Sequence, residues 1–285
     1  MRDIADKVAL VTGAGSGIGK ATAVALAREG ARLVLCDVNE AAVRETASEV
    51  TAISTCLAAR RVDVSKADEV EAFANEVHAL APAVDILVNN AGVHLVGGIL
   101  DLSLEDWKWV LGVNLWGVIR CSHCFVRKMA ERGAGGHVVN VSSMHGFWAA
   151  PHVIGYLTGK FGIYGFSEAL RADLRPYGIG VSTVCPGMIR TRLLENMRYK
   201  AGPDTAAARD HVEEIYRRRD YGPEKVARAI VRAIRRNRRR VFVSPESWLM
   251  YRIVRLSPEL GAIIARAAVR RMFPGAGTNN PRRKE

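Results

Sequence analysis

Two patterns of apolar residues alternate along the chain. Short, nearly continuous apolar runs predict buried parallel strands, and they lie at 7–12, 32–37, 56–64, 85–90, 137–142, 180–185 and 240–244. Longer runs with helical spacing of their apolar positions lie at 17–29, 40–50, 66–80, 103–131, 153–176 and 223–236. This alternation predicts an α/β fold: a single doubly wound, Rossmann-type domain with a central parallel sheet of about seven strands and helices on both faces.

The last part of the chain has a different pattern. Residues 1–245 contain every predicted strand, whereas 246–273 carry two helical stripes of apolar residues and predict a helical extension. We expect this extension to pack on the body or on a partner subunit, to cover a binding pocket, or to lie on an anionic membrane surface, in that order. The polar tail at 274–285 is expected to be disordered.

Charge is distributed unevenly between these parts. The chain has 285 residues, is 49% hydrophobic and carries a formal net charge of +12, so it can form a core but hints at an anionic partner. Residues 1–216 contain 22 Lys and Arg against 24 Asp and Glu, whereas 217–285 contain 19 against 5. The arginines at 235–240 follow a predicted helix, where cations complement the negative end of the dipole. Specific nucleic-acid binding is therefore not expected.

Cysteine usage and the N-terminus bear on the compartment. Five cysteines do not suggest a disulfide framework, which favours a reducing environment. The N-terminal segment enters the first strand directly, and no run of about 20 apolar residues predicts a signal or a transmembrane helix. These features predict a cytoplasmic protein, with peripheral membrane contact left open for the extension. "CSHC" at 121–124 lacks two further ligands at metal-binding spacing, so no metal site is predicted.

A glycine cluster joins the first strand to the first helix. The segment "TGAGSGIG" contains Gly13, Gly15, Ser16, Gly17, Ile18 and Gly19. Glycines there allow a tight turn and close approach to a pyrophosphate, and the helix N-terminus supplies free N–H groups. Asp37 ends the next strand, where a carboxylate accepts hydrogen bonds from ribose hydroxyls and repels a 2′-phosphate. The pattern predicts a dinucleotide site that prefers NAD to NADP, although Asp37 could also cap the next helix.

Further motifs follow in an order that resembles the short-chain dehydrogenase/reductase family. They are "TGAGSGIG" (12–19), "DV" (63–64), "NNAG" (89–92), "NLWG" (114–117), "VSS" (141–143), "YLTGK" (156–160) and "PGMIRT" (186–191). The resemblance covers roughly residues 5–245 and implies an NAD(P)-binding catalytic domain. The segment after "RVFVS" departs from the usual family ending, which puts a homotetramer in doubt but leaves a homodimer through 103–131 and 153–176.

The resemblance implies four catalytic residues. Tyr156 would exchange a proton with the substrate oxygen, and Lys160, one helical turn later, would lower the tyrosine pKa. Ser143, thirteen residues before Tyr156 as in the family, would hold the substrate oxygen. Asn114 would bind a water that links Lys160 to solvent.

The same resemblance implies the surrounding contacts. Tyr156 and Lys160 would also contact the nicotinamide ribose, and the other implied cofactor residues are Asp63, Val64, Asn90, Ala91, Gly92, Pro186, Gly187, Ile189 and Thr191. The loop after Ser143 would border the substrate through His145, Phe147 and Trp148, with 93–100 as a second wall. Residues 190–222 match the variable substrate loop of the family.

These expectations favour an NAD(P)-dependent oxidoreductase that interconverts a secondary alcohol and a ketone, with a bulky or lipophilic small-molecule substrate. Hydride would move to or from nicotinamide while Tyr156 handles the proton. The alternative is a nucleotide-binding scaffold or regulator whose basic C-terminal region binds nucleic acid or membrane. The presence of Asn114, Ser143, Tyr156 and Lys160 together favours the enzyme.

Overall fold

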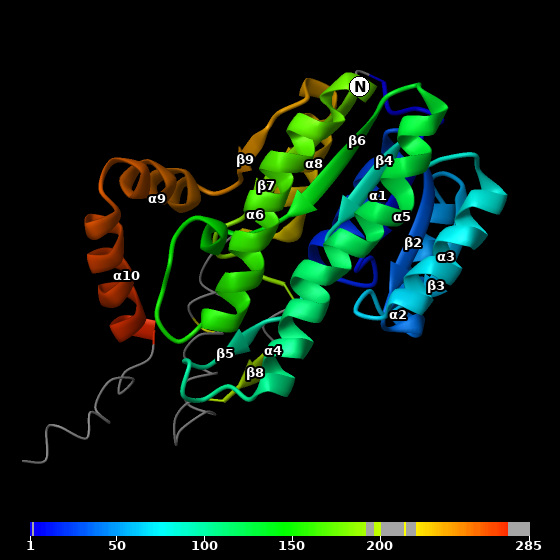
Figure 1. Ribbon diagram of the computed structural model, residues 1–285. Helices are drawn as coiled ribbons and strands as arrows, with labels where there is room; N and C mark the ends of the chain where they lie inside the picture. Colours follow the sequence, from blue (N-terminus) through cyan, green and yellow to red (C-terminus); the bar gives the residue numbers. More distant parts are fainter. Residues whose placement is uncertain (2, 192–196, 201–213, 215–220, 273–285) are drawn as a thin grey trace, which may run out of the picture.

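A seven-stranded parallel sheet forms the centre of the computed structural model, which describes residues 1, 3–191, 197–200, 214 and 221–272 (Figure 1). Its strands are β1 (Val8–Thr12), β2 (Arg32–Asp37), β3 (Cys56–Arg61), β4 (Ile86–Asn89), β6 (Gly136–Val141), β7 (Ile179–Cys185) and β9 (Arg240–Phe242). They are ordered β3-β2-β1-β4-β6-β7-β9. The α/β fold predicted from the apolar runs is confirmed.

Helices cover both faces of this sheet. One face packs α1 (Gly17–Arg28), α2 (Glu40–Thr51) and α8 (Pro223–Arg236). The opposite face packs α3 (Ala67–Leu80), α5 (Gly117–Arg132) and α6 (Ile154–Leu174). Strand β1 lies between β2 and β4, so the direction of winding reverses there. A crevice at the carboxyl ends of the strands is expected at such a switch point.

The helix predicted at 103–131 is interrupted in the structure. It consists of α4 (Leu104–Leu111), a π-helical turn η1 (Gly112–Trp116) and α5. A capping box between Ser103 and Asp106 begins α4. By length and composition, 104–132 could cross a membrane, but core helices of the same composition pass that test, and 44% of its most apolar window is buried. π-turns are frequent at functional sites, and this one carries Asn114.

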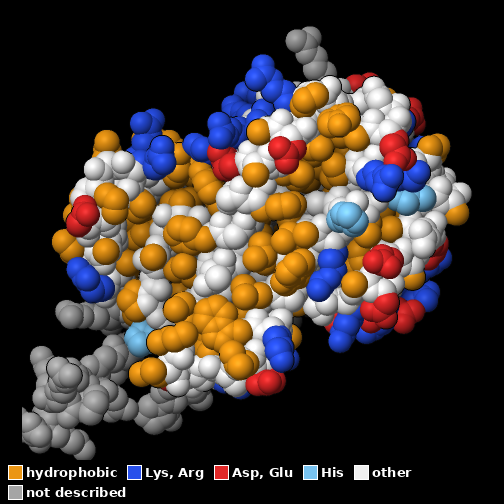
Figure 2. All heavy atoms as spheres, viewed as in Figure 1, with side chains coloured by type: hydrophobic (Ala, Val, Ile, Leu, Met, Phe, Trp, Pro, Cys, Tyr) orange, Lys and Arg blue, Asp and Glu red, His pale blue; other side chains and the backbone are white. Residues whose placement is uncertain are grey.

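The arginines at 235–240 surround the end of α8. In Figure 2, Lys and Arg side chains gather at the upper edge of the molecule, where α8 ends and β9 begins. Asn237 closes the helix in the left-handed conformation, at φ 48°. Arg235 pairs with Glu29, and Arg240 pairs with Glu168 at 2.6 Å. These ion pairs link the helix end to the neighbouring elements of the body.

The C-terminal extension packs on its own body. It is a hairpin of α9 (Pro245–Leu256) and α10 (Pro258–Met272). The Ser247 hydroxyl donates to the carbonyl of Cys185 at the end of β7, at 2.8 Å. Met144 and Trp148, from the segment before α6, join Met250 and Ala265 in a small apolar cluster. This arrangement is the first of those expected from the sequence, while residues 273–285 lie outside the described part of the chain.

A second sheet was not predicted from the sequence. It consists of β5 (Leu95–Val96) and β8 (Arg198–Tyr199), which pair in parallel. The backbone N–H of Arg198 donates to the His94 carbonyl at 3.1 Å. Lys200 forms an ion pair with Asp106 of α4 at 3.2 Å. The small sheet therefore joins the segment after β4 to the start of the predicted substrate loop, most of which lies outside the described residues.

Candidate active site

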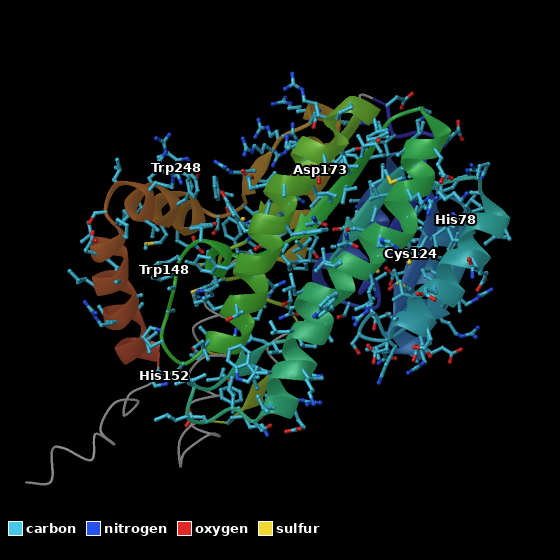
Figure 3. All side chains as sticks on the ribbon, viewed as in Figure 1. His78, Cys124, Trp148, His152, Asp173 and Trp248 are labelled. Carbon is cyan, nitrogen blue, oxygen red and sulfur yellow. The ribbon has the colours of Figure 1, made fainter. Side chains whose placement is uncertain are left out.

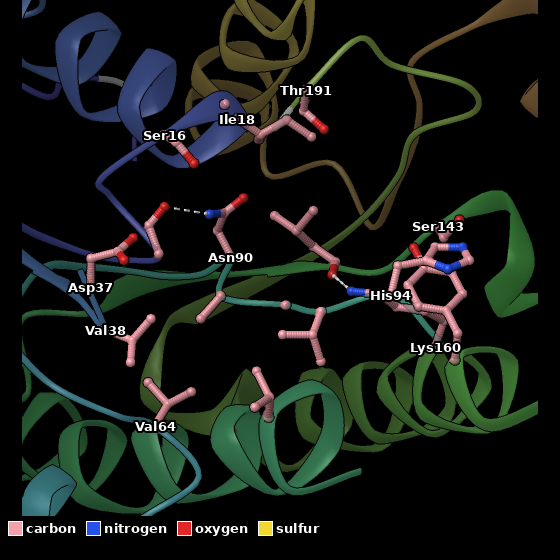
Figure 4. A pocket seen from close by; sticks show the side chains of 18 of the residues that line it. Ser16, Ile18, Asp37, Val38, Val64, Asn90, His94, Ser143, Lys160 and Thr191 are labelled. Carbon is pink, nitrogen blue, oxygen red and sulfur yellow. Dashed lines mark hydrogen bonds between the residues drawn. The ribbon is translucent and has the colours of Figure 1, made fainter. Parts of the chain in front are cut away.

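One cavity of about 690 Å³ lies at the carboxyl edge of the large sheet. The predicted residues that line it are Gly13, Gly15, Ser16, Gly17, Ile18, Asp37, Asp63, Val64, Asn90, Ala91, Gly92, Ser143, His145, Tyr156, Lys160, Pro186, Gly187, Ile189 and Thr191. In Figure 4, Asp37 and Val38 lie at one end of this pocket, and Ser143, His94 and Lys160 gather at the other. The sheet edge thus brings segments from across the chain into one wall.

The glycine loop is packed so tightly that side chains would not fit. Gly13 has φ +63°, and a Cβ there would lie 2.8 Å from the Cα of Ala91. A Cβ on Gly19 would lie 1.9 Å from the carbonyl oxygen of Gly13. Gly19 therefore packs against the loop from behind and does not line the cavity. The exposed backbone and the start of α1 form a cradle that fits a pyrophosphate.

Thr12 and Asn90 fasten this loop to β4. The Thr12 hydroxyl accepts the N–H groups of Asn90 and Ala91, at 3.0 and 3.1 Å. The Asn90 amide nitrogen donates to the carbonyls of Thr12 and Gly13, at 3.0 and 3.1 Å. Two motifs far apart in sequence are therefore locked together at the switch point.

Asp37 lies beside the glycine loop, at the end of the cavity opposite Ser143. One of its carboxylate oxygens accepts the N–H of Gly15 at 2.9 Å, and the other accepts the N–H of Asn39 at 2.9 Å. The helix that follows is capped by Asn39, whose side chain accepts from Ala42 at 3.1 Å. Asp37 therefore supports the phosphate loop, and the capping of α2 that it was expected to share falls to Asn39.

Tyr156 and Lys160 project into the cavity from the first two turns of α6. Burial raises the pKa of Tyr156 to about 12, although a hydrogen bond with Ser143 opposes this rise. Burial lowers the pKa of Lys160 to about 8. The lysine amine donates to the carbonyl of Val141 at 3.0 Å and lies 5.6 Å from the centroid of the tyrosine ring.

The pKa of Tyr156 differs from the value expected from the sequence. Lys160 was expected to lower the pKa of Tyr156, yet desolvation dominates and raises that pKa above its ordinary value. The opposing influence comes from Ser143. Ser142 is turned away from the phenol, because its hydroxyl donates to the backbone carbonyl of Lys160 at 2.8 Å.

Besides Gly19, three predicted residues do not line the cavity. The amide of Asn114 bonds both backbone groups of Val93, at 2.8 and 2.9 Å, so it holds the segment after β4 in place. Its water-relay role stays a prediction. Phe147 packs against Phe242 and Tyr251, and the Trp148 indole donates to the carbonyl of Gly261 at 2.9 Å. The two aromatic residues expected to form a pocket wall thus face the extension, and Figure 3 shows Trp148 on that side of the body.

Comparisons with known proteins agree with this geometry. The family model for short chain dehydrogenases matches residues 7–202. The chain belongs to the short chain dehydrogenase family. A crystal structure of a family member from Burkholderia phymatum in complex with NAD has a TM-score of 0.84 and 32% identity, covering 92% of this chain and 97% of that one. The chain therefore shares the Rossmann fold of this family, together with its glycine-rich motif for nucleotide binding.

The chain is also similar to curated proteins. A probable oxidoreductase, EphD of Mycobacterium tuberculosis (strain ATCC 25618 / H37Rv), is 42% identical over 93% of this chain. The chain covers 45% of that relative, about half its length. The C alpha-dehydrogenase of Sphingobium sp. (strain NBRC 103272 / SYK-6) is 31% identical over 86% of this chain and 83% of the relative.

Sequence reasoning overlooked three side chains in the wall of this short chain dehydrogenase cavity. The His94 ring stacks on the Tyr156 ring, with centroids 4.1 Å apart and planes at 22°. Burial lowers the pKa of His94 to about 3, so its ring is neutral. Trp109 and Arg198 also line the cavity, and the guanidinium carbon of Arg198 lies 3.8 Å from the Trp109 ring centroid. His94 falls within the predicted second wall, but nothing local singled it out.

Proposed function

We propose that the protein interconverts a secondary alcohol and a ketone, with NAD as hydride acceptor or donor. The observation that carries this proposal is the placement of Tyr156, Ser143 and Lys160 in the same cavity wall as the glycine cradle. When bound, the nicotinamide supplies the hydride chemistry. The name of the Sphingobium relative, a dehydrogenase, supports the same reaction class.

Three side chains would handle the proton at the substrate oxygen. A phenol is protonated at neutral pH at its ordinary pKa of about 10, and burial, which raises the pKa of Tyr156 to about 12, keeps it so. Tyr156 can therefore donate to the oxygen of a ketone. Ser143 hydrogen-bonds the same phenol and would hold the oxygen beside it. For the reverse reaction, Tyr156 must give up its proton first, and the nearby ammonium of Lys160 stabilises the phenolate that results.

Replacement of Tyr156 tests this function. Tyr156→Phe removes the proton donor but keeps the ring that stacks on His94. We expect kcat for secondary alcohols to fall by on the order of a thousandfold, while NADH affinity, measured by fluorescence, changes little. A variant that retained near-normal kcat would show that another group moves the proton. Tyr164→Phe, on the same helix but outside the cavity lining, is the control.

The preference for NAD rests on the charges around the adenosine end. The Lys and Arg residues among the described lining residues are Lys160 and Arg198, both at the opposite end of the cavity. In the proposed binding mode the 2′ position of the adenosine ribose lies beside Asp37, and Val38 next to it is 60% exposed. A 2′-phosphate there would meet a carboxylate, with no compensating cation at this end among the described lining residues.

A double substitution measures this preference. Asp37→Ala with Val38→Arg removes the repulsion and adds a guanidinium. We expect the ratio of kcat/KM for NAD over NADP to fall by at least about tenfold. Val38→Arg alone, which keeps the carboxylate, is the matched control and should shift the ratio less. An unchanged ratio in the double variant would refute the role of Asp37.

We also propose assembly as a homodimer through α5 and α6. Trp116, the last residue of η1 directly before α5, is 52% exposed, and Phe161 on α6 is 39% exposed. Large apolar side chains on adjacent helices are typical of a buried subunit interface. Light scattering of Trp116→Glu would show a monomer if this surface forms the dimer.

A further inference from the structure

The end of the cavity around Tyr156 has its own chemistry. We call it the substrate end, formed by His94, Trp109, Met144, His145 and Arg198. His94 stacks on the Tyr156 ring, and His145 meets the same ring edge-on with centroids 6.3 Å apart. Arg198 belongs to this end because its backbone N–H bonds the carbonyl of His94. The surface is therefore largely aromatic and apolar.

Two of the described residues carry formal positive charge at this end, Lys160 and Arg198. Burial lowers the pKa of both His94 and His145, so neither ring is charged at neutral pH. The Lys160 amine donates to the carbonyl of Val141 and, in the proposed reaction, stabilises the Tyr156 phenolate. The carboxylates among the described lining residues are Asp37 and Asp63. Asp37 lies away from this end, beside the glycine loop (Figure 4), and Asp63 directly follows Val62, whose N–H donates to the Asp37 carbonyl. Arg198 thus gives the substrate end a positive field.

The guanidinium of Arg198 is held in a defined orientation. Its face lies over Trp109 at 3.8 Å, a contact that leaves the N–H groups at its edge free to bind a planar anion. Its strand is fixed on both sides, by the His94 carbonyl and by the ion pair of Lys200 with Asp106. Asp106, the buried acid on the same helix as Trp109, is also occupied by Ser103.

We propose that Arg198, stacked on Trp109, binds an anionic group of the substrate. The substrate class is then an apolar secondary alcohol or ketone that carries a carboxylate or phosphate at a distance from the reacting carbon. The apolar wall receives the body of the molecule, and the guanidinium receives the anion by charge-assisted hydrogen bonds. This inference rests on the proposed function, because it takes Tyr156 as the place where the reacting oxygen binds.

Binding to the NADH-saturated protein tests the subsite without requiring turnover. The probes are methyl-ketone carboxylic acids of increasing chain length, their methyl esters, and ketones of the same lengths that end in a phosphate monoester. Calorimetry compares the wild type with Arg198→Gln, which removes the charge and keeps most of the side chain. Arg252→Gln is the matched control, because Arg252 also lies over a tryptophan, Trp248 at 5.2 Å, but outside the cavity.

We expect the wild type to bind at least one acid or phosphate more tightly than the ester of the same length. Arg198→Gln should weaken that anion by about tenfold at low salt, leave the ester unchanged and leave NADH affinity unchanged. Whether the carboxylate or the phosphate series responds identifies the anion. Arg252→Gln should change none of these affinities.

Three results would overturn the subsite. The first is equal binding of anions and esters, or no binding of any anion, by the wild type. The second is equal weakening of acid and ester by Arg198→Gln. The third is weaker NADH binding with an unchanged acid-to-ester ratio, which would assign Arg198 to the cofactor phosphates. Failure of the proposed reaction looks different: the anion binds through Arg198 but is not reduced, and Tyr156→Phe changes nothing.

Discussion

The two ends of the cavity are built by different means. The end beside Asp37 is made of backbone, with glycines packed against Ala91 and Gly13 at distances that exclude a Cβ. The substrate end is made of side chains that stack on one another: His94 lies on Tyr156, and His145 is backed by Trp148 from outside the cavity. A backbone cradle suits a cofactor of fixed shape, whereas a wall of side chains can be altered one residue at a time.

The difference extends to what supports each end. The glycine loop is supported from inside the sheet, by Thr12 and Asn90 on adjacent strands. The substrate end is supported from outside, because Trp148 and Met144 pack under the C-terminal hairpin. Changes in the core should therefore affect the cofactor, and changes in the extension should affect the substrate.

The largest effect should come from adding one methyl group to the backbone cradle. Gly19→Ala would place a Cβ 1.9 Å from the carbonyl oxygen of Gly13, so the loop must move. Overpacking costs up to about 3 kcal/mol. If the NADH-binding conformation of the loop bears this cost, NADH affinity falls by on the order of a hundredfold. Gly165→Ala is the matched control, because a Cβ there meets nothing within 4 Å. Normal NADH affinity in Gly19→Ala would contradict a rigid cradle.

A second prediction concerns Lys160, which lies at the same end of the cavity as Ser143 and His94. Burial lowers its pKa from 10.5 to about 8, so the unfolded chain binds more protons than the folded one between these values. The contribution of this lysine to stability therefore rises as pH increases from 8 to 10.5. At neutral pH the buried charge costs about 3 kcal/mol, and its bond to Val141 returns about 1 kcal/mol.

Lys160→Met should therefore be more stable than the wild type by about 2 kcal/mol at pH 7, although it should be inactive. Urea unfolding at several pH values measures the difference, which should shrink between pH 8 and pH 10. Effects of other titrating groups cancel in the comparison of the two proteins. Lys128→Met is the control, because Lys128 lies on the surface of α5 and its side chain is 49% exposed. A Lys160→Met variant less stable than the wild type would show that burial of the ammonium does not destabilise the folded protein.

The backbone-built end could be predicted from sequence, because its signals are local. The glycine spacing, the strand before it and Asp37 after the next strand lie within one βαβ unit, and the structure places them around one cavity. The sheet and its flanking helices were predicted for the same reason, since a buried strand is a short apolar run.

The side-chain-built end could not be predicted in this way. The stack of His94 on Tyr156 and the contact of Arg198 with Trp109 depend on β5 and β8, strands of two residues each that carry no recognisable pattern. Phe147 and Trp148 were assigned to the pocket because of their place in the chain. Their side chains face the hairpin instead, and only tertiary packing decides that direction.

The smallest predicted effect tests whether the hairpin serves the substrate end alone. Trp148→Phe keeps an aromatic ring, although a smaller one, and removes the indole N–H that donates to the Gly261 carbonyl, so we expect a loss of at least about 1 kcal/mol in the free energy of unfolding. Because Trp148 stacks on His145, with centroids 5.6 Å apart, the KM for substrate should rise a few-fold while NADH affinity stays constant. Trp248→Phe, on the outer side of α9 where the side chain is half exposed, should change neither quantity. A rise in the dissociation constant of NADH in Trp148→Phe would mean that the two ends are coupled, and that the hairpin supports the cofactor as well.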